Sequence, residues 1–171
     1  QSQAARVMAF ILATYTGGLE RDQIIEMLWP EVNPEKGIGR FYPTLHRLRS
    51  ALASDLVIQD NGLYMLNPAY SCRYDLFEFR KLFKLSSTAD DEAAHNARVR
   101  AIGLYHSHFL EVCEGEWAEG IRQETRRDLL TLLLAEAAYQ GRANALAQAE
   151  NLYRRALDLD PLDERAHRGL M

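Results

Sequence analysis

The segment from residue 56 to residue 66, LVIQDNGLYML, constrains the fold more than any other part of the 171-residue chain. Two runs of β-prone residues flank Asn61-Gly62, and both of these residue types accept the positive φ angles of a tight two-residue turn. The pattern predicts a β-hairpin. Because the rest of the sequence has mainly helical periodicity, we expect one hairpin within a mainly α chain.

Three helical patterns precede this hairpin. The first covers residues 2 to 15 and stops at Gly17-Gly18, and the second is a short amphipathic pattern from Leu19 to Trp29. Asn33-Pro34 then breaks the chain and can begin a third helix with proline in its first turn. Three short helices followed by a two-stranded hairpin is the order of a winged helix-turn-helix, in which the third helix normally enters the major groove.

The third helical pattern has an apolar side and a cationic side. The apolar side contains Phe41, Leu45, Leu48 and Leu52. The opposite side contains Lys36, Arg40, Pro43, Arg47 and Ser50, with Thr44 and His46 at its flanks. Four Lys or Arg residues and no Asp or Glu occur between positions 36 and 54. A solvated surface helix and a helix that lies against an anion both agree with this pattern.

Pro43 falls within this third pattern. Proline costs about 3 kcal/mol in the interior of a helix. We therefore expect residues 34 to 40 to form a loosely joined turn and the regular helix to start near Tyr42.

From about residue 75 the sequence is helical to its end. Asp75 and Glu78 have the spacing of a capping box at the start of a helix. Further helices are predicted over residues 90–105, 116–139 with an end at Gly141, 143–159 and 162–171. The stretch from 135 to 161 has the small residues, the glycine turn and the Asp-Pro end of a tetratricopeptide-type helical hairpin, a repeat that stacks into a concave surface.

Several of these segments resemble one family of bacterial regulators. LWPEVNPEK, FYPTLHRLRSAL, VIQDNGLYMLNP and YDLFEF resemble the winged-helix part of activators of the antibiotic-regulatory (SARP) type. AIGLYHSHFLEV, GEWAEGIRQET and ALDLDPLDERAHRGLM are similar to the bacterial transcriptional activator domain that follows it. The short strands that usually precede the first helix are absent, and proline replaces the family's usual polar residue at position 43.

The resemblance covers about residues 19 to 171 and implies two domains. An OmpR-like winged helix-turn-helix is expected over residues 1–68, and a tetratricopeptide-like bacterial transcriptional activator domain over residues 69–171. We expect the chain to be a fragment of a longer protein, truncated within the second domain. The implied partners are double-stranded DNA together with RNA polymerase, a second copy of the chain or other segments of the parent protein.

Carried over position by position, the resemblance also implies a set of DNA contacts. Arginine can bind guanine or phosphate through two parallel hydrogen bonds, which suits this role. Arg49 lies nearer the buried edge, where it reaches a phosphate or an internal acid. The tip of the hairpin, Gln59 to Asn61, has no positive charge, so a weak contribution from the wing is expected. The candidate DNA-binding residues are Lys36, Arg40, Thr44, His46, Arg47 and Arg49.

Composition excludes several other classes of function. No apolar run approaches the ~20 residues needed to span a bilayer. Cys72 and Cys113 are far apart, which argues against a disulfide framework and suits the reducing cytoplasm. The net charge of −4 argues against a protein that coats nucleic acid generally, but it allows a local basic face.

A catalytic or metal site is not expected. His106 and His108 point to different sides of a helix, with no Cys or carboxylate at ligand spacing. The acidic run around Trp117 lacks a nucleophile, and its charge suits the start of a helix. Trp29 and Trp117 are interpreted as core residues. The acidic run consists of Glu111, Glu114, Glu116 and Glu119.

Two hypotheses therefore follow from the sequence. In the first, the chain is a cytoplasmic, non-enzymatic transcription regulator without a cofactor, in which the winged helix binds promoter DNA and the helical domain mediates protein contacts. In the second, it is a protein-interaction module whose winged helix no longer binds DNA, because winged helices also serve as docking units. A positive stripe along Lys36, Arg40 and Arg47 favours the first, and an adjacent acidic patch that cancels it favours the second.

Overall fold

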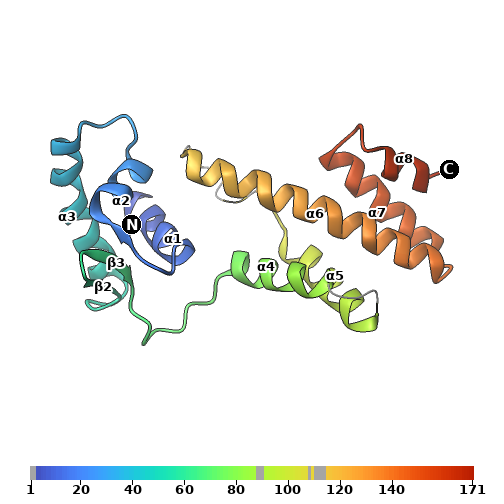
Figure 1. Cartoon of the computed structure of the whole chain (residues 1–171), viewed down its shortest axis with the longest axis horizontal. Coiled ribbons are helices and arrows are strands. Elements are labelled where there is room, and N and C mark those ends of the chain that lie inside the picture. Colours follow the sequence, from blue (N-terminus) through green and yellow to red (C-terminus); the bar gives the residue numbers. More distant parts are fainter. Residues whose placement is uncertain (1–2, 88–90, 108, 110–114) are drawn as a thin grey trace. The chain divides into compact units, whose positions relative to one another are not determined.

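The computed structural model describes residues 3–87, 91–107, 109 and 115–171. These residues form two compact units (Figure 1). The first unit contains residues 3–73 together with 115–117, and the second contains the described residues from 74 to 109 together with 118–171. The chain is mainly helical with a small sheet, as the sequence predicts.

Three helices form most of the first unit: α1 (Gln3–Thr14), α2 (Arg21–Leu28) and α3 (Pro34–Ala51). The first two lie within a few residues of the predicted patterns. Glu20 and Gln23 form a capping box at the start of α2, where the backbone N–H of Glu20 donates to Oε1 of Gln23 at 2.9 Å. This box was not predicted, because Glu rather than Ser or Thr stands at the capping position.

The sheet of the first unit contains β1 (Leu19–Glu20), β2 (Val57–Asp60) and β3 (Leu63–Leu66) in the order β1-β3-β2, all antiparallel. Asp60 pairs with Leu63, so Asn61-Gly62 forms the two-residue loop, with φ angles of 49° and 86°. The predicted hairpin is confirmed. Strand β1 was not predicted, since two residues are too few to show alternation.

The expected break in the third helix is wrong, because α3 is continuous from Pro34 to Ala51. Its start is fixed by Asn33, whose side chain accepts a hydrogen bond from the backbone N–H of Glu35 at 2.9 Å. Pro43 and the residue four positions before it, Gly39, are both exposed, so water can replace the helical bond that proline removes.

Close packing also holds the first turns of α3 in place. Gly37 is buried against Ile25 of α2, and a Cβ atom at position 37 would overlap Cγ2 of Ile25. Helix α3 therefore needs glycine here to reach α2. This contact keeps residues 34 to 40 helical, although a local rule for proline predicts a turn.

The core of the first unit lies between α1, α2, α3 and the sheet. Phe41, Leu45 and Leu48 of α3 are buried in it, as predicted, and the ring of Phe41 meets that of Tyr64 edge to face at a centroid distance of 5.0 Å. Leu52 was expected on the same face, but it follows the last turn of α3 and is 62% exposed. Trp29 and Trp117 are half-buried against this core, which agrees with their interpretation as core residues.

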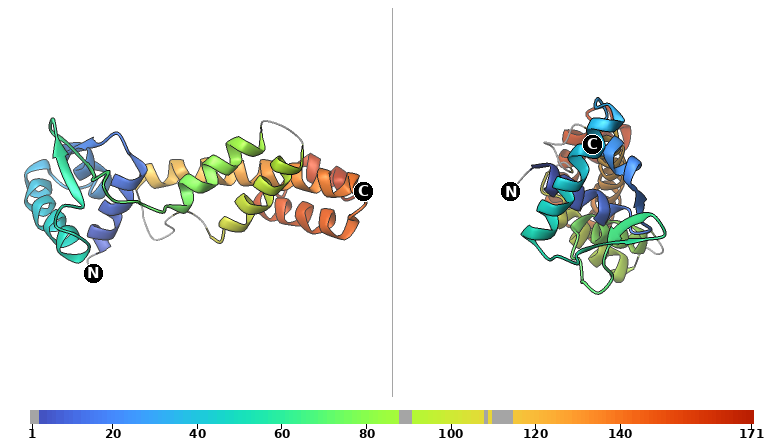
Figure 2. Two further views of the ribbon diagram at one scale, coloured as in Figure 1. Left: turned by 90° about the horizontal axis from the view of Figure 1, so that it is seen from below. Right: turned by 90° about the vertical axis from the view of Figure 1, so that its left-hand side faces the viewer.

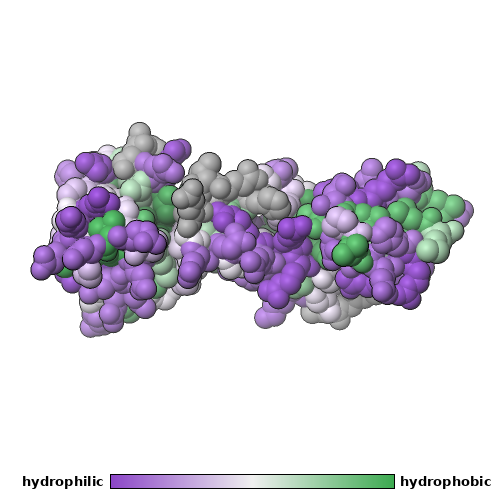
Figure 3. Space-filling view, turned by 90° about the horizontal axis from the view of Figure 1, so that it is seen from above, coloured by the Kyte–Doolittle hydropathy of each residue, from purple (hydrophilic) through white to green (hydrophobic). Residues whose placement is uncertain are grey.

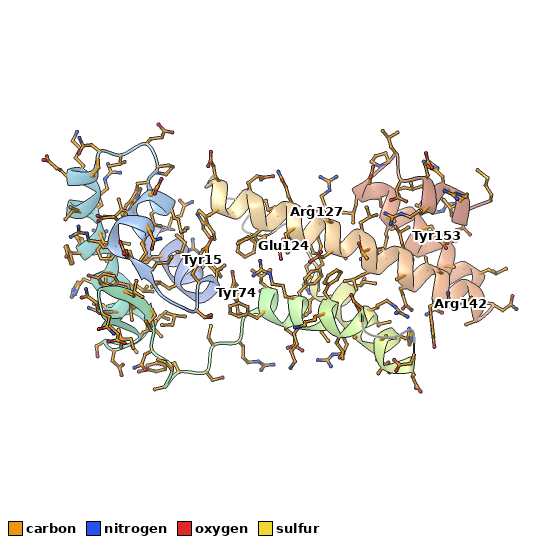
Figure 4. The ribbon with its side chains drawn as sticks, in the orientation of Figure 1. Tyr15, Tyr74, Glu124, Arg127, Arg142 and Tyr153 are labelled. Atoms are coloured by element: carbon orange, nitrogen blue, oxygen red, sulfur yellow. The ribbon has the colours of Figure 1, made fainter. Side chains whose placement is uncertain are left out.

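The second unit consists of α4 (Asp75–Ser86), α5 (Glu92–Leu104), α6 (Glu116–Arg142, from residue 118 onward), α7 (Leu146–Leu159) and α8 (Glu164–Gly169). Helices α4 and α5 lie along one side of α6, and α7 folds back against its C-terminal half (Figures 1 and 2). Phe79, Ala101 and Leu132 from three different helices belong to its buried core. Tyr153 of α7, labelled in Figure 4, has its ring against Gly169 of α8, where an added Cβ atom would overlap the ring.

Two of the sequence signals for helix ends in the second unit differ from the structure. Asp75 is the first residue of α4. Tyr74 precedes it at the capping position, where no side-chain capping bond is formed, so the predicted capping box at Asp75 and Glu78 is wrong. Gly141 lies inside α6, which ends at Arg142. The left-handed residue after this helix is Asn144, with a φ angle of 60°.

Apolar side chains reach the surface near the C-terminal helices of the second unit (Figure 3). The exposed large hydrophobic residues in this part are Leu146, Leu162, Leu170 and Met171. Among the described residues, no helix combines the length and the apolar character that a membrane crossing requires.

Candidate nucleic-acid interface

Helix α3 carries a row of exposed residues on the side that faces away from the core. We call this row the cationic stripe; in chain order it consists of Lys36, Arg40, Pro43, Arg47 and Ser50. The spacing of three or four residues places all five along one side of the helix. All five are exposed, as the sequence predicts, and the hairpin β2–β3 follows this helix directly in the chain.

The cations of this stripe have no carboxylate partner among the residues that the structure describes. Within the described parts of the chain, no carboxylate oxygen lies within 4.0 Å of the charged nitrogen atoms of Lys36, Arg40 or Arg47. Nor does α3 itself supply an acid beyond Glu35 in its first turn. The three side chains are therefore available to an external anion.

The two residues predicted to flank the stripe have different surroundings. His46 is exposed next to Arg47. Thr44 is only 2% exposed, so the prediction that it lies on the outward side is wrong. Helix α3 packs against both α1 and α2, and the buried sector of the helix is therefore wider than the single apolar row of the sequence suggests.

Arg49 has an internal partner. Its Nε and Nη2 atoms donate to the backbone oxygen of Val57 at 3.2 and 2.6 Å. The predicted partner was a phosphate or an internal acid, and the structure corrects this to a backbone carbonyl. Because Val57 is the first residue of β2, the bond joins the end of α3 to the start of the hairpin.

A second group of hydrogen bonds closes the base of the hairpin, and sequence reasoning missed it. Nδ2 of Asn67 donates to the backbone oxygen of Asp55 at 3.1 Å. The hydroxyl of Tyr70 donates to Oδ1 of Asp55 at 2.6 Å, and this bond raises the pKa of Tyr70. Together with Arg49, these bonds fix the hairpin relative to α3.

The tip of the hairpin borders a polar hollow of about 330 Å³. Gln59 and Asn61 line it from the hairpin, and Glu20 and Asp22 line it from the start of α2. Arg21 also lines the hollow, but its Nε atom is paired with Oδ1 of Asp22 at 2.8 Å, a bond that raises the pKa of Arg21. The side of the hairpin tip therefore lacks the unpaired positive charge found on α3.

Metal binding and acid–base catalysis have little support in the described parts of the chain. No group of three or more His, Cys, Asp or Glu residues that could hold a metal ion occurs there. His106 and Cys72 are exposed. Glu116 and Glu119 of the acidic run are also exposed, and His108, Glu111, Cys113 and Glu114 lie outside the described residues.

Residues 74–171 match the family model described as the bacterial transcriptional activator domain. The match covers more than half of the chain. The chain belongs to this family. Membership gives it a regulatory function of the transcriptional activator type and confirms the SARP-type resemblance of the sequence over these residues. A comparison with curated proteins finds no match.

Proposed function

We propose that the chain is part of a DNA-binding transcription regulator of the cytoplasm. Its first unit is a winged helix-turn-helix in which α3 enters the major groove and the hairpin β2–β3 is the wing. The single observation that carries this proposal is the cationic stripe on the helix that directly precedes the hairpin: three exposed cations that no carboxylate of the described residues pairs with. This order of elements is that of the winged helix motif.

Within this proposal the residues of the stripe have separate roles. Lys36 and Arg40 neutralise phosphates, which supplies affinity that is independent of DNA sequence. This affinity falls steeply as the salt concentration rises, because the release of counterions from the DNA then gains less entropy. Arg47, with His46 beside it, reaches base edges, because arginine can bind guanine through two hydrogen bonds. Arg49 holds the hairpin in place through Val57 instead of contacting DNA.

The second unit is proposed to be a tetratricopeptide-like domain that mediates protein contacts. Helices α5, α6 and α7 enclose a groove of about 770 Å³. Gln140, Gln148 and Asn151 line it, and their carboxamides can both donate to and accept from a peptide backbone. RNA polymerase, a second copy of the chain and other segments of the parent protein are the proposed partners.

The test of DNA binding begins with selection of bound duplexes from a random pool by the full chain. Fluorescence anisotropy then compares an enriched duplex with a scrambled one. Replacing Arg40 and Arg47 together by alanine is expected to abolish most of the binding, because both lie on the proposed contact face. Arg154→Ala is the matched control, since it removes an arginine that is already paired with Glu150 in the second unit. Unchanged binding by the double variant would overturn the assignment of α3.

The second candidate is a protein-interaction module whose winged helix no longer binds DNA. The net charge of −4 and the two acids beside the hairpin tip favour it. The same selection separates the two functions. A DNA-binding unit enriches a sequence whose binding weakens with salt, whereas a docking unit enriches none.

A further inference from the structure

A groove lined by α1 and the C-terminal half of α3 lies on the surface of the first unit. Its volume is about 460 Å³, which lies in the range of small-molecule sites in proteins. Apolar side chains supply most of its lining, including Ala5, Ala9, Leu48 and Leu52. Leu52 is 62% exposed, so part of this apolar lining is open to solvent.

Positive charge borders the same groove from both helices. Arg6 of α1 and Arg47 of α3 line it, with His46 next to Arg47, and no acid is among its lining residues. Neither arginine has a carboxylate oxygen of the described residues within 4.0 Å. An apolar floor with two unneutralised guanidinium groups at its border is complementary to a molecule that has an apolar body and one negative charge.

We propose that this groove binds a small amphipathic anion, an aromatic or aliphatic carboxylate or sulfonate. The apolar body lies on the alanine and leucine side chains, and the anionic group binds Arg6 and Arg47. Guanidinium groups bind carboxylates through charge-assisted hydrogen bonds, which are stronger than bonds between neutral groups. A protein segment is a poorer fit, because the volume of the groove corresponds to one small molecule.

The position of Arg47 connects this site to the proposed DNA contacts. Arg47 belongs both to the lining of the groove and to the cationic stripe, so an anion bound there occupies a side chain that DNA also needs. The bound anion therefore weakens DNA binding. This second step rests on the proposed function, whereas binding of the anion does not.

Anion binding is tested by calorimetric titration of the full chain with naphthoate and with the neutral alcohol naphthalenemethanol. Naphthoate is expected to bind with a dissociation constant of about 0.1 to 1 mM, and the alcohol at least tenfold more weakly. Arg6→Gln should weaken naphthoate binding about threefold or more, whereas Lys36→Gln, which removes a cation outside the groove, should not. Equal affinities for the acid and the alcohol, or no binding of either, would overturn the site.

Competition with DNA is tested separately by anisotropy. Naphthoate is expected to raise the apparent dissociation constant of an enriched duplex for the wild-type chain, and to do so less for Arg6→Gln. Binding of naphthoate by a chain that binds no DNA would leave the site in place and overturn the proposed function. Binding of both without competition would overturn the connection through Arg47. Binding of an acidic amphipathic peptide but not of naphthoate would replace the small molecule by a protein partner.

Discussion

In the second unit, Arg80, Arg98 and Arg100 each bind a carboxylate on another helix, whereas the arginines of the cationic stripe on α3 bind none among the described residues. Nη2 of Arg80 of α4, for example, lies 2.6 Å from Oε2 of Glu124 of α6, the residue labelled in Figure 4. The same residue type thus joins helices in the second unit, whereas on the cationic stripe of α3 it lies exposed without a carboxylate partner among the described residues. Composition cannot show this difference, because it depends on whether an acid lies within reach of each arginine.

Arg98 and Glu136 form an ion pair in which both side chains are almost completely buried. Their side chains are 3% and 2% exposed, and Nε of Arg98 donates to Oε2 of Glu136 at 2.9 Å. Nδ1 of His95 lies 2.8 Å from Oε1 of the same carboxylate, to which Gln140 also donates at 2.8 Å. Arg98 further lies over the ring of Tyr139, with 5.4 Å between its Cζ atom and the ring centroid.

The largest effect is expected from Glu136→Ala. The variant leaves the buried guanidinium of Arg98 without this carboxylate, and losing one partner of a buried pair costs about 3–5 kcal/mol of unfolding free energy. Urea unfolding of the full chain, followed by far-ultraviolet circular dichroism, measures this loss. A loss below about 1 kcal/mol would mean that the pair contributes no more than an exposed one, and the contrast between the two units would disappear.

The next largest effect concerns the open arginines. Arg47→Ala is expected to cost about 1–3 kcal/mol of DNA-binding free energy and to relax the sequence preference at one position, because a base contact is lost. Lys36→Ala should instead weaken binding similarly on all sequences and reduce the salt slope by about one. Anisotropy titrations on enriched and scrambled duplexes at several salt concentrations measure both. Identical behaviour of the two variants would contradict the separate roles.

Local signals in the sequence predicted most elements of the first unit but not their contacts. Asn61-Gly62 specified the hairpin, because the turn depends only on residues that adjoin it. The continuity of α3 was missed, because it depends on the packing of Gly37 against Ile25, which lies twelve positions earlier. A rule for Pro43 alone contains no information about that contact.

The sequence predicted the exposed cations of the candidate site but not every residue at its edge. Periodicity placed Lys36, Arg40 and Arg47 on the exposed side correctly, because all three lie opposite the apolar row. It failed for Thr44, since a helix that packs against two neighbours buries a wider sector than one row. Whether any of these residues contacts DNA stays a prediction.

Arg49 sharpens the comparison, because it is an arginine of the first unit with an internal partner. Arg49→Met removes the hydrogen bonds to the backbone oxygen of Val57, a residue that is 1% exposed. A buried carbonyl without its donor costs about 1–2 kcal/mol of unfolding free energy. Arg47→Met is the matched control and should change stability by less than about 0.5 kcal/mol. Thermal unfolding of the two variants side by side decides the matter, and equal losses would show that Arg47 is also held internally.

A smaller, pH-dependent effect is expected at Asp163. Its carboxylate caps α8 by accepting from the backbone N–H groups of Arg165 and Ala166 at 2.9 and 3.0 Å. The guanidinium of Arg165 is the main cause that lowers the pKa of Asp163. Because the folded state lowers this pKa, the carboxylate stabilises the fold above its unfolded pKa of about 3.9 and loses that contribution as the pH falls through the folded value.

Asp163→Ala should therefore lower the unfolding free energy by about 1 kcal/mol near neutral pH, and the difference from the wild type should shrink in acid. Asp163→Asn is the matched control, since asparagine keeps the cap but carries no charge. Unfolding of the three chains between pH 2 and 7, about the range in which an aspartate titrates, provides the measurement. A difference between Asp163→Ala and the wild type that is constant over this range would rule out a contribution from the charge.

The smallest effect is expected for an exposed ion pair. It tests whether pairing alone or burial makes arginines stabilise the second unit. Arg154 and Glu150 of α7 are a well-formed pair at 2.6 Å, yet their side chains are 71% and 53% exposed. Exposed pairs four residues apart on a helix contribute about 0.3–0.5 kcal/mol, and salt screens them. Glu150→Ala should therefore lower the unfolding free energy by no more than this in low salt, and by less in 1 M salt, which is about ten times the usual ionic strength.

The size of this loss decides between the two origins. If the loss of unfolding free energy matched that of Glu136→Ala, pairing alone would stabilise the second unit, and the arginines of the stripe would differ only in lacking a nearby acid. If it is as small as expected, burial makes Arg98 structural, and exposure leaves Arg40 and Arg47 of the cationic stripe free for another molecule.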